Sequence, residues 1–175
     1  MKINEKSARQ AVVLLSGGLD SMVAAGLAVE AGYEINALTI DYNQRHRCEI
    51  EAARVIANHL GAVRHVVLPL DLRQFGGSAL TDDIAVPKGG VTDEIPITYV
   101  PARNLVFLSL TLAWAEALGA RDVFIGVNAL DYSGYPDCRD DTMKAMQLAL
   151  SLGMDKRYLI ETPLMWIDKA QTWRM

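Results

Sequence analysis

The chain has 175 residues, of which 51% are hydrophobic and 22% are charged, and its net charge is −4 at pH 7. This length and composition predict a single globular domain over residues 1–175 with a sizeable core, and they exclude a long disordered segment. The acidic balance disfavours nonspecific binding to nucleic acid or to an acidic membrane, so we expect small molecules as partners.

The first predicted element is a buried strand over residues 11–15, because the run AVVLL is apolar and too short for an ordinary helix. Ser16, Gly17 and Gly18 follow it, and their main-chain N–H groups could close around a phosphate at the start of the next helix. Asp20 could then contact magnesium, and the hydroxyl of Ser21 could contact a phosphate. The alternative is a tight strand-to-helix turn capped by Ser21. The chain contains neither the Gly-x-x-x-x-Gly-Lys-Ser/Thr pattern nor the Gly-x-Gly-x-x-Gly pattern.

Further along the chain, a helix-like segment ends in glycine four times, and an apolar segment follows each time. Glycine is the preferred residue just past a helix end, so these junctions predict helix-to-strand connections. The glycines are Gly32, Gly61, Gly119 and Gly153, and the strands predicted after them cover residues 35–40, 63–68, 123–127 and 158–160. The alternation predicts an α/β fold with an open five-stranded parallel sheet and helices on both faces.

Two of the predicted helices differ in their apolar pattern. Ile50, Ala53, Ala57 and Leu60 share one face of an amphipathic helix. Residues 103–118 have almost no polar face, so we expect this helix to be buried nearly all round, with Pro101 in its first turn. Arg103 at its start then needs a partner, which could be a phosphate, a substrate carboxylate or an internal acid.

Residues 71–98 interrupt the alternation, because they are rich in glycine and aspartate and show little apolar periodicity. A connection of this length predicts a lid or a mobile insertion, with a solvated surface loop as the alternative.

Polar clusters follow three of the predicted strands, which is where an open parallel sheet binds ligands. They cover residues 16–21, 41–47 and 126–139. The second could instead be the solvated first turn of a helix, and the third could be an ordinary turn rather than a pocket for a planar polar ligand. We expect Cys138 to be packed rather than nucleophilic, because no base lies near it in the sequence.

No membrane span or cysteine framework is predicted. The N-terminal residues are polar and no apolar run reaches the ~18 residues of a span, so we expect a cytoplasmic protein. Cys48 and Cys138 lie far apart and by themselves predict neither a disulfide framework nor a zinc site.

The motif SGGLDS after a strand resembles the PP-loop of the N-type ATP pyrophosphatases. The stretches IDYNQRHRCEIEAA, TYVPARNLVFLSLTLAWAE and GVNALDYSGYPDCR are similar to the 7-cyano-7-deazaguanine synthase family within that superfamily. The resemblance runs from the first strand to the end of the chain. It implies a Rossmann-like, adenine nucleotide alpha hydrolase-like fold. It also implies a dimeric enzyme of queuosine precursor biosynthesis that converts 7-carboxy-7-deazaguanine and ammonia to the nitrile, with ATP and Mg²⁺.

The resemblance also implies roles for particular residues. The expected catalytic residues are Asp20, Arg103 and Lys169, with Asp20 as the magnesium ligand. The expected ATP-binding residues are Leu15, Ser16, Gly17, Gly18, Leu19, Asp20, Ser21, Asp41 and Gly126. The expected substrate-binding residues are Gln44, Arg45, His46, Asp131, Tyr135, Asp137 and Arg139.

The chain departs from the family pattern in two places. Family members extend further and carry a C-terminal cysteine cluster that binds Zn²⁺, so we interpret this chain as a truncated fragment or a variant without the zinc ligands. Asp140 and Asp141 stand where the family usually has Pro-Glu after Cys-Arg, which puts the local turn in doubt.

Two other functions remain open from the sequence. One is a different amidating or thiolating PP-loop enzyme, although the acidic charge argues against a tRNA substrate. The other is an adenine-nucleotide-binding module without enzymatic activity.

Overall fold

A computed structural model describes residues 9–42, 48–72, 99–129 and 135–175. The strands are β1 (Gln10–Leu14), β2 (Glu34–Asp41), β3 (Arg64–Pro69), β4 (Asp122–Ile125) and β5 (Leu159–Glu161). The helices are α1 (Leu19–Glu30), α2 (Cys48–His59), α3 (Arg103–Leu118), α4 (Asp140–Gly153) and α5 (Lys169–Thr172), with a 3₁₀ turn, η2, at Pro136–Cys138. The region predicted as a lid falls, from residue 73 to residue 98, outside the described residues. None of the described helices has the length and apolar character needed to cross a membrane.

The five strands form one parallel sheet in the order β3-β2-β1-β4-β5, which confirms the predicted fold class. The strand order reverses between β1 and β4. The connections that leave their carboxyl ends therefore run in opposite directions and leave a crevice between the two strands. This is the point at which a ligand site is expected.

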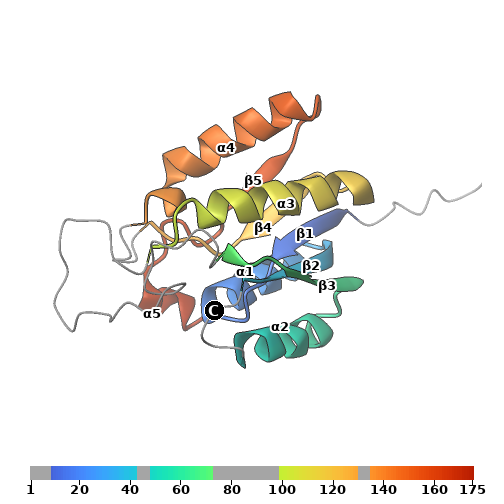
Figure 1. Cartoon of the computed structure of the whole chain (residues 1–175). Helices are drawn as coiled ribbons and strands as arrows, with labels where there is room; N and C mark the ends of the chain where they lie inside the picture. Colours follow the sequence, from blue (N-terminus) through green and yellow to red (C-terminus); the bar gives the residue numbers. More distant parts are fainter. Residues whose placement is uncertain (1–8, 43–47, 73–98, 130–134) are drawn as a thin grey trace, which may run out of the picture.

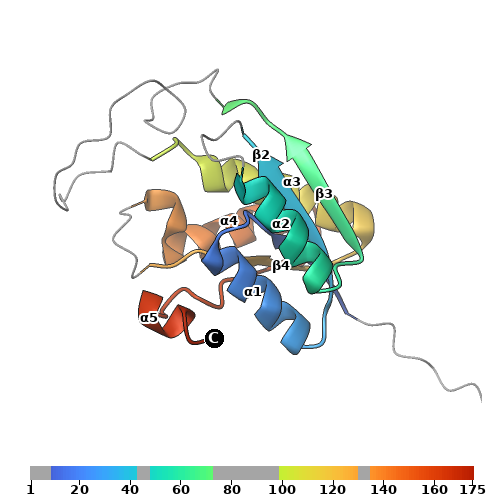
Figure 2. The same ribbon diagram turned by 90° about the horizontal axis from the view of Figure 1, so that it is seen from below.

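Helices cover both faces of the sheet, with α1 and α2 on one side and α3 and α4 on the other (Figures 1 and 2). Side chains of β1 alternate between the two layers. Val12 and Leu14 belong to the core under α3 and α4, whereas Ala11, Val13 and Leu15 belong to the core under α1 and α2. A strand buried on both faces explains why residues 11–15 are continuously apolar rather than alternating.

Three of the four predicted glycine caps are confirmed. Gly32, Gly61 and Gly119 have φ values of 84°, 67° and 74°, in the left-handed region that glycine adopts without steric cost. The prediction for Gly153 is wrong, because this residue is the last of α4. The left-handed conformation lies two residues later, at Asp155 with φ 49°.

The boundaries of α3 agree with the prediction, but its burial does not. Phe107, Leu108 and Leu112 pack in the core, whereas Ala113 and Ala117 on the opposite side are exposed. The sheet covers one face and α4 lies beside it, which leaves a face to solvent despite its apolar residues (Figure 1).

The prediction for Pro101 is also wrong, since the N-cap of α3 is Ala102 and the proline precedes it. The amphipathic face of α2 is confirmed for Ile50, Ala53 and Ala57. Leu60 lies just beyond the end of α2 and is partly buried against the same core.

Candidate active site

A cavity of about 330 Å³ lies at the carboxyl ends of β1 and β4, at the reversal in strand order. Its walls come from the loop after β1, from the residues after β4, and from the first turn of α3. The polar residues that line it are Ser16, Asp20, Ser21, Tyr42, Glu49, Arg103, Asn104, Asn128 and Tyr135. Apolar side chains, including Ile40, Phe107 and Ile125, cover much of the remaining surface. Such a mixture is typical of a small-molecule site.

The loop after β1 has a defined conformation that depends on glycine. Gly17 has φ 91°, and a Cβ atom there would lie 2.0 Å from the carbonyl oxygen of Glu49 in α2. Gly18 is the N-cap of α1, and the backbone N–H groups of that first turn lie at the positive end of the helix dipole. The geometry can therefore accept an anion, as a phosphate-binding loop requires.

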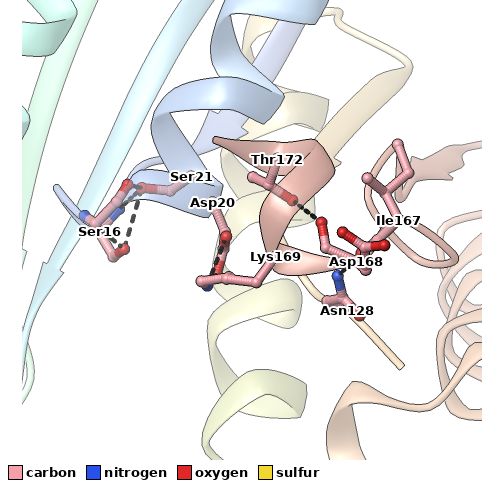
Figure 3. Close-up of polar contacts among 9 residues, drawn as sticks. Ser16, Asp20, Ser21, Asn128, Ile167, Asp168, Lys169 and Thr172 are labelled. Carbon is pink, nitrogen blue, oxygen red and sulfur yellow. Dashed lines mark hydrogen bonds and ion pairs between the residues drawn. The ribbon is translucent and has the colours of Figure 1, made fainter. Parts of the chain in front are cut away.

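The hydroxyl of Ser21 holds this loop together (Figure 3). It accepts a hydrogen bond from the backbone N–H of Ser16 at 3.2 Å, donates to the carbonyl of Gly18 at 2.9 Å, and lies 3.1 Å from the Ser16 hydroxyl. Ser21 is buried. Its observed contacts are thus those of the turn-stabilising alternative, while its contact with phosphate stays a prediction.

Gly126 allows the end of β4 to approach the first turn of α1. A Cβ atom at this position would lie 2.6 Å from the carbonyl carbon of Asp20 and 2.8 Å from the backbone nitrogen of Ser21. Because backbone atoms cannot move aside as a side chain can, only glycine fits here without displacing α1. Gly126 therefore helps to form the cavity through close packing.

Asp20 and Lys169 meet at the edge of the cavity although 149 residues separate them (Figure 3). The Lys169 ammonium lies 2.7 and 2.9 Å from the two carboxylate oxygens of Asp20. Lys169 begins the short helix α5, whose N-cap, Asp168, forms a reciprocal capping box with Gln171. Two predicted catalytic residues are therefore in direct contact.

Arg103 lies between two tyrosines in the wall of the cavity. Its guanidinium donates to the hydroxyl of Tyr42 at 3.2 Å and lies 5.6 Å and 5.9 Å from the ring centroids of Tyr42 and Tyr135. Within the described part of the chain, no carboxylate forms an ion pair with Arg103. Its positive charge is therefore available to an anion in the cavity.

The segment after residue 134 is placed partly in the cavity and partly behind it. Tyr135 lines the cavity, whereas Asp137 is buried and accepts the backbone N–H of Asn104 at 2.9 Å, where it stabilises the start of α3. Arg139 is the residue before α4 and is not among the lining residues. Cys138 is partly buried against the core, which confirms the expected packing, and this burial raises the pKa of its thiol to about 12.

The remaining predicted site residues either do not line the cavity or fall outside the described residues. Asp41 lies at the end of β2, where its carbonyl accepts the N–H of Leu70 at 2.7 Å, and it is not among the lining residues. The predictions for Gln44, Arg45, His46 and Asp131 fall outside the described residues.

Several residues outside the predicted set also line the cavity, among them Tyr42, Asn104, Phe107 and Asn128. Tyr42 directly follows β2 and Asn128 lies three residues after β4, so their position after a strand end could have identified them. Asn104 and Phe107 lie in the first turns of α3, where only the packing of α3 on the sheet brings them to the cavity.

Comparison with known proteins relates this chain to one family. The model of the family described as "Queuosine biosynthesis protein QueC" matches residues 10–175. The chain is 64% identical over 166 residues to a 7-cyano-7-deazaguanine synthase of Novosphingobium aromaticivorans, covering 92% of this chain and 71% of the relative. It is 61% identical over 170 residues to that of Rhizorhabdus wittichii, covering 94% and 74%.

The fold also resembles solved structures at low identity. A protein of Methanocaldococcus jannaschii described as a predicted subunit of a tRNA methyltransferase superposes with a TM-score of 0.60 and 19% identity, covering 95% of this chain and 73% of that chain. At this identity the likeness supports the shared fold alone.

Proposed function

The chain belongs to the family of the queuosine biosynthesis protein QueC, and from this we propose that its cavity binds ATP on the loop at residues 16–21 and binds the substrate carboxylate near Arg103. Its function is that of a 7-cyano-7-deazaguanine synthase, an ATP-dependent ligase that forms carbon–nitrogen bonds. One observation supports the arrangement: the glycine-containing loop at residues 16–21 and Arg103, which has no carboxylate partner among the described residues, face the same cavity.

The reaction needs the carboxylate of 7-carboxy-7-deazaguanine to become a leaving group. A carboxylate oxygen attacks the α-phosphorus of ATP, pyrophosphate departs, and an acyl-adenylate forms. Ammonia then attacks the carbonyl carbon and AMP leaves, which gives the amide. A second ATP adenylates the amide oxygen, and loss of AMP and a proton gives the nitrile. No step requires a nucleophilic side chain, so fixed charges and positions can supply the catalysis.

The phosphates would lie where α1 begins. The N–H groups of that turn and the Lys169 ammonium would stabilise the charge on the departing pyrophosphate. Arg103 would hold the substrate carboxylate or the α-phosphate on the other side of the cavity, because its guanidinium matches either group with two hydrogen bonds.

Asp20 fits the role of a magnesium ligand. Mg²⁺ is usually bound through one or two carboxylates together with substrate phosphates, and Asp20 supplies one carboxylate in the cavity. The ion would neutralise phosphate charge. Zinc is different, because the described residues include no cluster of three or more His, Cys, Asp or Glu that could hold a metal ion. We therefore assign no step to Zn²⁺.

We further propose a cytoplasmic homodimer that acts on small molecules. ATP is supplied in the cytoplasm, and both cysteines are free thiols, as that compartment favours. Leu148 and Leu152 on α4 are 62% and 73% exposed, and a second copy could cover this apolar surface. Sedimentation velocity at micromolar concentration tests the dimer, and a monomer at all concentrations would contradict it.

The activity itself has a direct test. The protein is incubated with ATP, Mg²⁺, ammonia and 7-carboxy-7-deazaguanine, and AMP and the nitrile are measured by mass spectrometry. We expect two AMP for each nitrile, and the amide as an intermediate. Binding of ATP without substrate-dependent release of AMP would contradict the proposal and favour a nucleotide-binding module.

A further inference from the structure

Lys169 is carried by a helix that is too short to be stable alone. Helix α5 has four residues, which is about one turn, and an isolated turn has an unfavourable free energy of formation. The capping box closes the turn, since the Gln171 N–H donates to Asp168 at 2.8 Å and the Asp168 N–H donates to the Gln171 side chain at 3.0 Å. These bonds lie within residues 168–171, so they do not attach the turn to the sheet.

Two hydrogen bonds from the residues after β4 make that attachment, and Figure 3 shows the one that joins Asn128 to Ile167. The side-chain amide of Asn128 donates to the carbonyl of Ile167, and the backbone N–H of Ala129 donates to the carbonyl of Met165 at 3.0 Å. Asn128 is 6% exposed, so water competes weakly for its amide. The bonds therefore fix the segment before α5 relative to β4.

The contact between Lys169 and Asp20 is of another kind. Their side chains are 46% and 26% exposed, and an ion pair so open to water contributes little to stability. It can exchange for other charges at low cost. The buried amide of Asn128, by contrast, binds the carbonyl of Ile167, which is only two residues before Lys169.

We propose that Asn128 is a positioning residue that holds Lys169 beside the phosphate loop, so that its ammonium can move from Asp20 to the β- and γ-phosphates of ATP. The inference rests on the proposed function for the identity of the nucleotide, and it assigns to Asn128 no contact with the reacting atoms. Lys169 is then placed best for the phosphates while the Asn128 amide holds the Ile167 carbonyl.

The test is a double-mutant cycle with Asn128→Ala and Lys169→Ala, with binding of MgATP and of AMP measured by calorimetry. Asn128→Ala should weaken MgATP binding roughly ten- to a hundredfold, the cost of misplacing a charged group by about 1 Å. It should leave AMP binding unchanged, because AMP lacks the β- and γ-phosphates. In the Lys169→Ala background it should have no further effect.

Two more variants control for folding. Asn128→Asp keeps the shape, loses the donor and adds a negative charge at the cavity, so it should weaken MgATP binding at least as much as Asn128→Ala. Gln147→Ala removes a comparable tether, since the Gln147 side chain accepts the Ile160 N–H at 2.8 Å, but this tether lies away from the cavity and its loss should leave MgATP binding unchanged.

The inference would be overturned if Asn128→Ala and Lys169→Ala weakened MgATP binding independently, so that their losses added in the double variant. Wild-type MgATP binding in Asn128→Asp would also overturn it. An equal loss of AMP binding would also overturn it, because Asn128 would then act on the adenosine or on the whole fold. Failure of the wild-type protein to form the nitrile would count against the proposed function alone.

Discussion

Substitution of Gly126 by alanine should displace the first turn of α1, which forms part of the phosphate loop. The new Cβ would lie 2.6 Å from the carbonyl carbon of Asp20 and 2.7 Å from its carbonyl oxygen, whereas ordinary contact begins at 3.4 Å. The first turn of α1 must therefore retreat by roughly 0.8 Å, and overpacking of this kind costs about 1–3 kcal/mol. In a chain of this size that is a fall of about 2–12 °C in Tm.

The same retreat moves Asp20 and the backbone nitrogen of Ser21, so Gly126→Ala should also weaken ATP binding. Thermal unfolding and calorimetric titration with MgATP measure the two effects. Gly26→Ala is the control, because Gly26 lies in α1, the helix that Gly126→Ala would displace, and has no neighbour within 4 Å of an added Cβ. It should raise stability by about 0.8–1 kcal/mol through helix propensity. Unchanged Tm and ATP affinity in Gly126→Ala would refute the packing argument.

Three further outcomes are expected. Asp20→Asn should lower magnesium-dependent turnover at least roughly a hundredfold while changing the unfolding free energy by under about 1 kcal/mol, and an equally large loss of stability would favour a purely structural role. Arg103→Lys should raise KM for the deazaguanine substrate about tenfold with little change in Tm, because lysine keeps the charge but loses the planar fork between the tyrosines, and an unchanged KM would contradict this. Burial raises the pKa of Cys138 to about 12, so its thiol stays protonated at pH 8, and iodoacetamide followed by peptide mapping should modify the exposed Cys48 first.

Local patterns predicted the sheet well because each helix-to-strand connection carries its own signal. Glycine is nearly obligatory where a chain leaves a helix with positive φ, and Gly32, Gly61 and Gly119 occupy such positions. Gly153 shows the limit of this reasoning, since nothing in its neighbourhood distinguishes a glycine inside the last turn from one beyond it.

The burial of α3 could not be predicted from composition. Apolar content shows that a helix has a face to bury, but which faces are covered depends on the neighbours. Ala113 and Ala117 are small enough to face solvent at little cost, while Phe107 and Leu112 pack on the sheet. The prediction failed because it counted apolar residues without knowing how far α4 extends over α3.

In the site, too, the contiguous motif could be predicted from the sequence, whereas the long-range contacts could not. Loop 16–21 is contiguous, so its motif identified it. The contacts of Lys169 with Asp20 and of Asn128 with Ile167 join residues 149 and 39 positions apart, and no spacing rule relates them. They arise only when the parallel sheet brings the ends of β1 and β4 together.

The strand order also has a consequence for how the chain is made. β1 pairs with β4, and Ala11 lies opposite Asp122, so a ribosome must add about 110 residues before β1 gains its second neighbour. At about 5–20 residues per second, this apolar strand keeps one open edge for roughly 5–20 s during synthesis. The nucleotide site cannot be complete in that interval, because the lining residues at the end of β4, including Gly126 and Asn128, have yet to emerge. ATP can therefore stabilise the finished protein, but it cannot protect the nascent chain at the stage when exposed strands aggregate most readily.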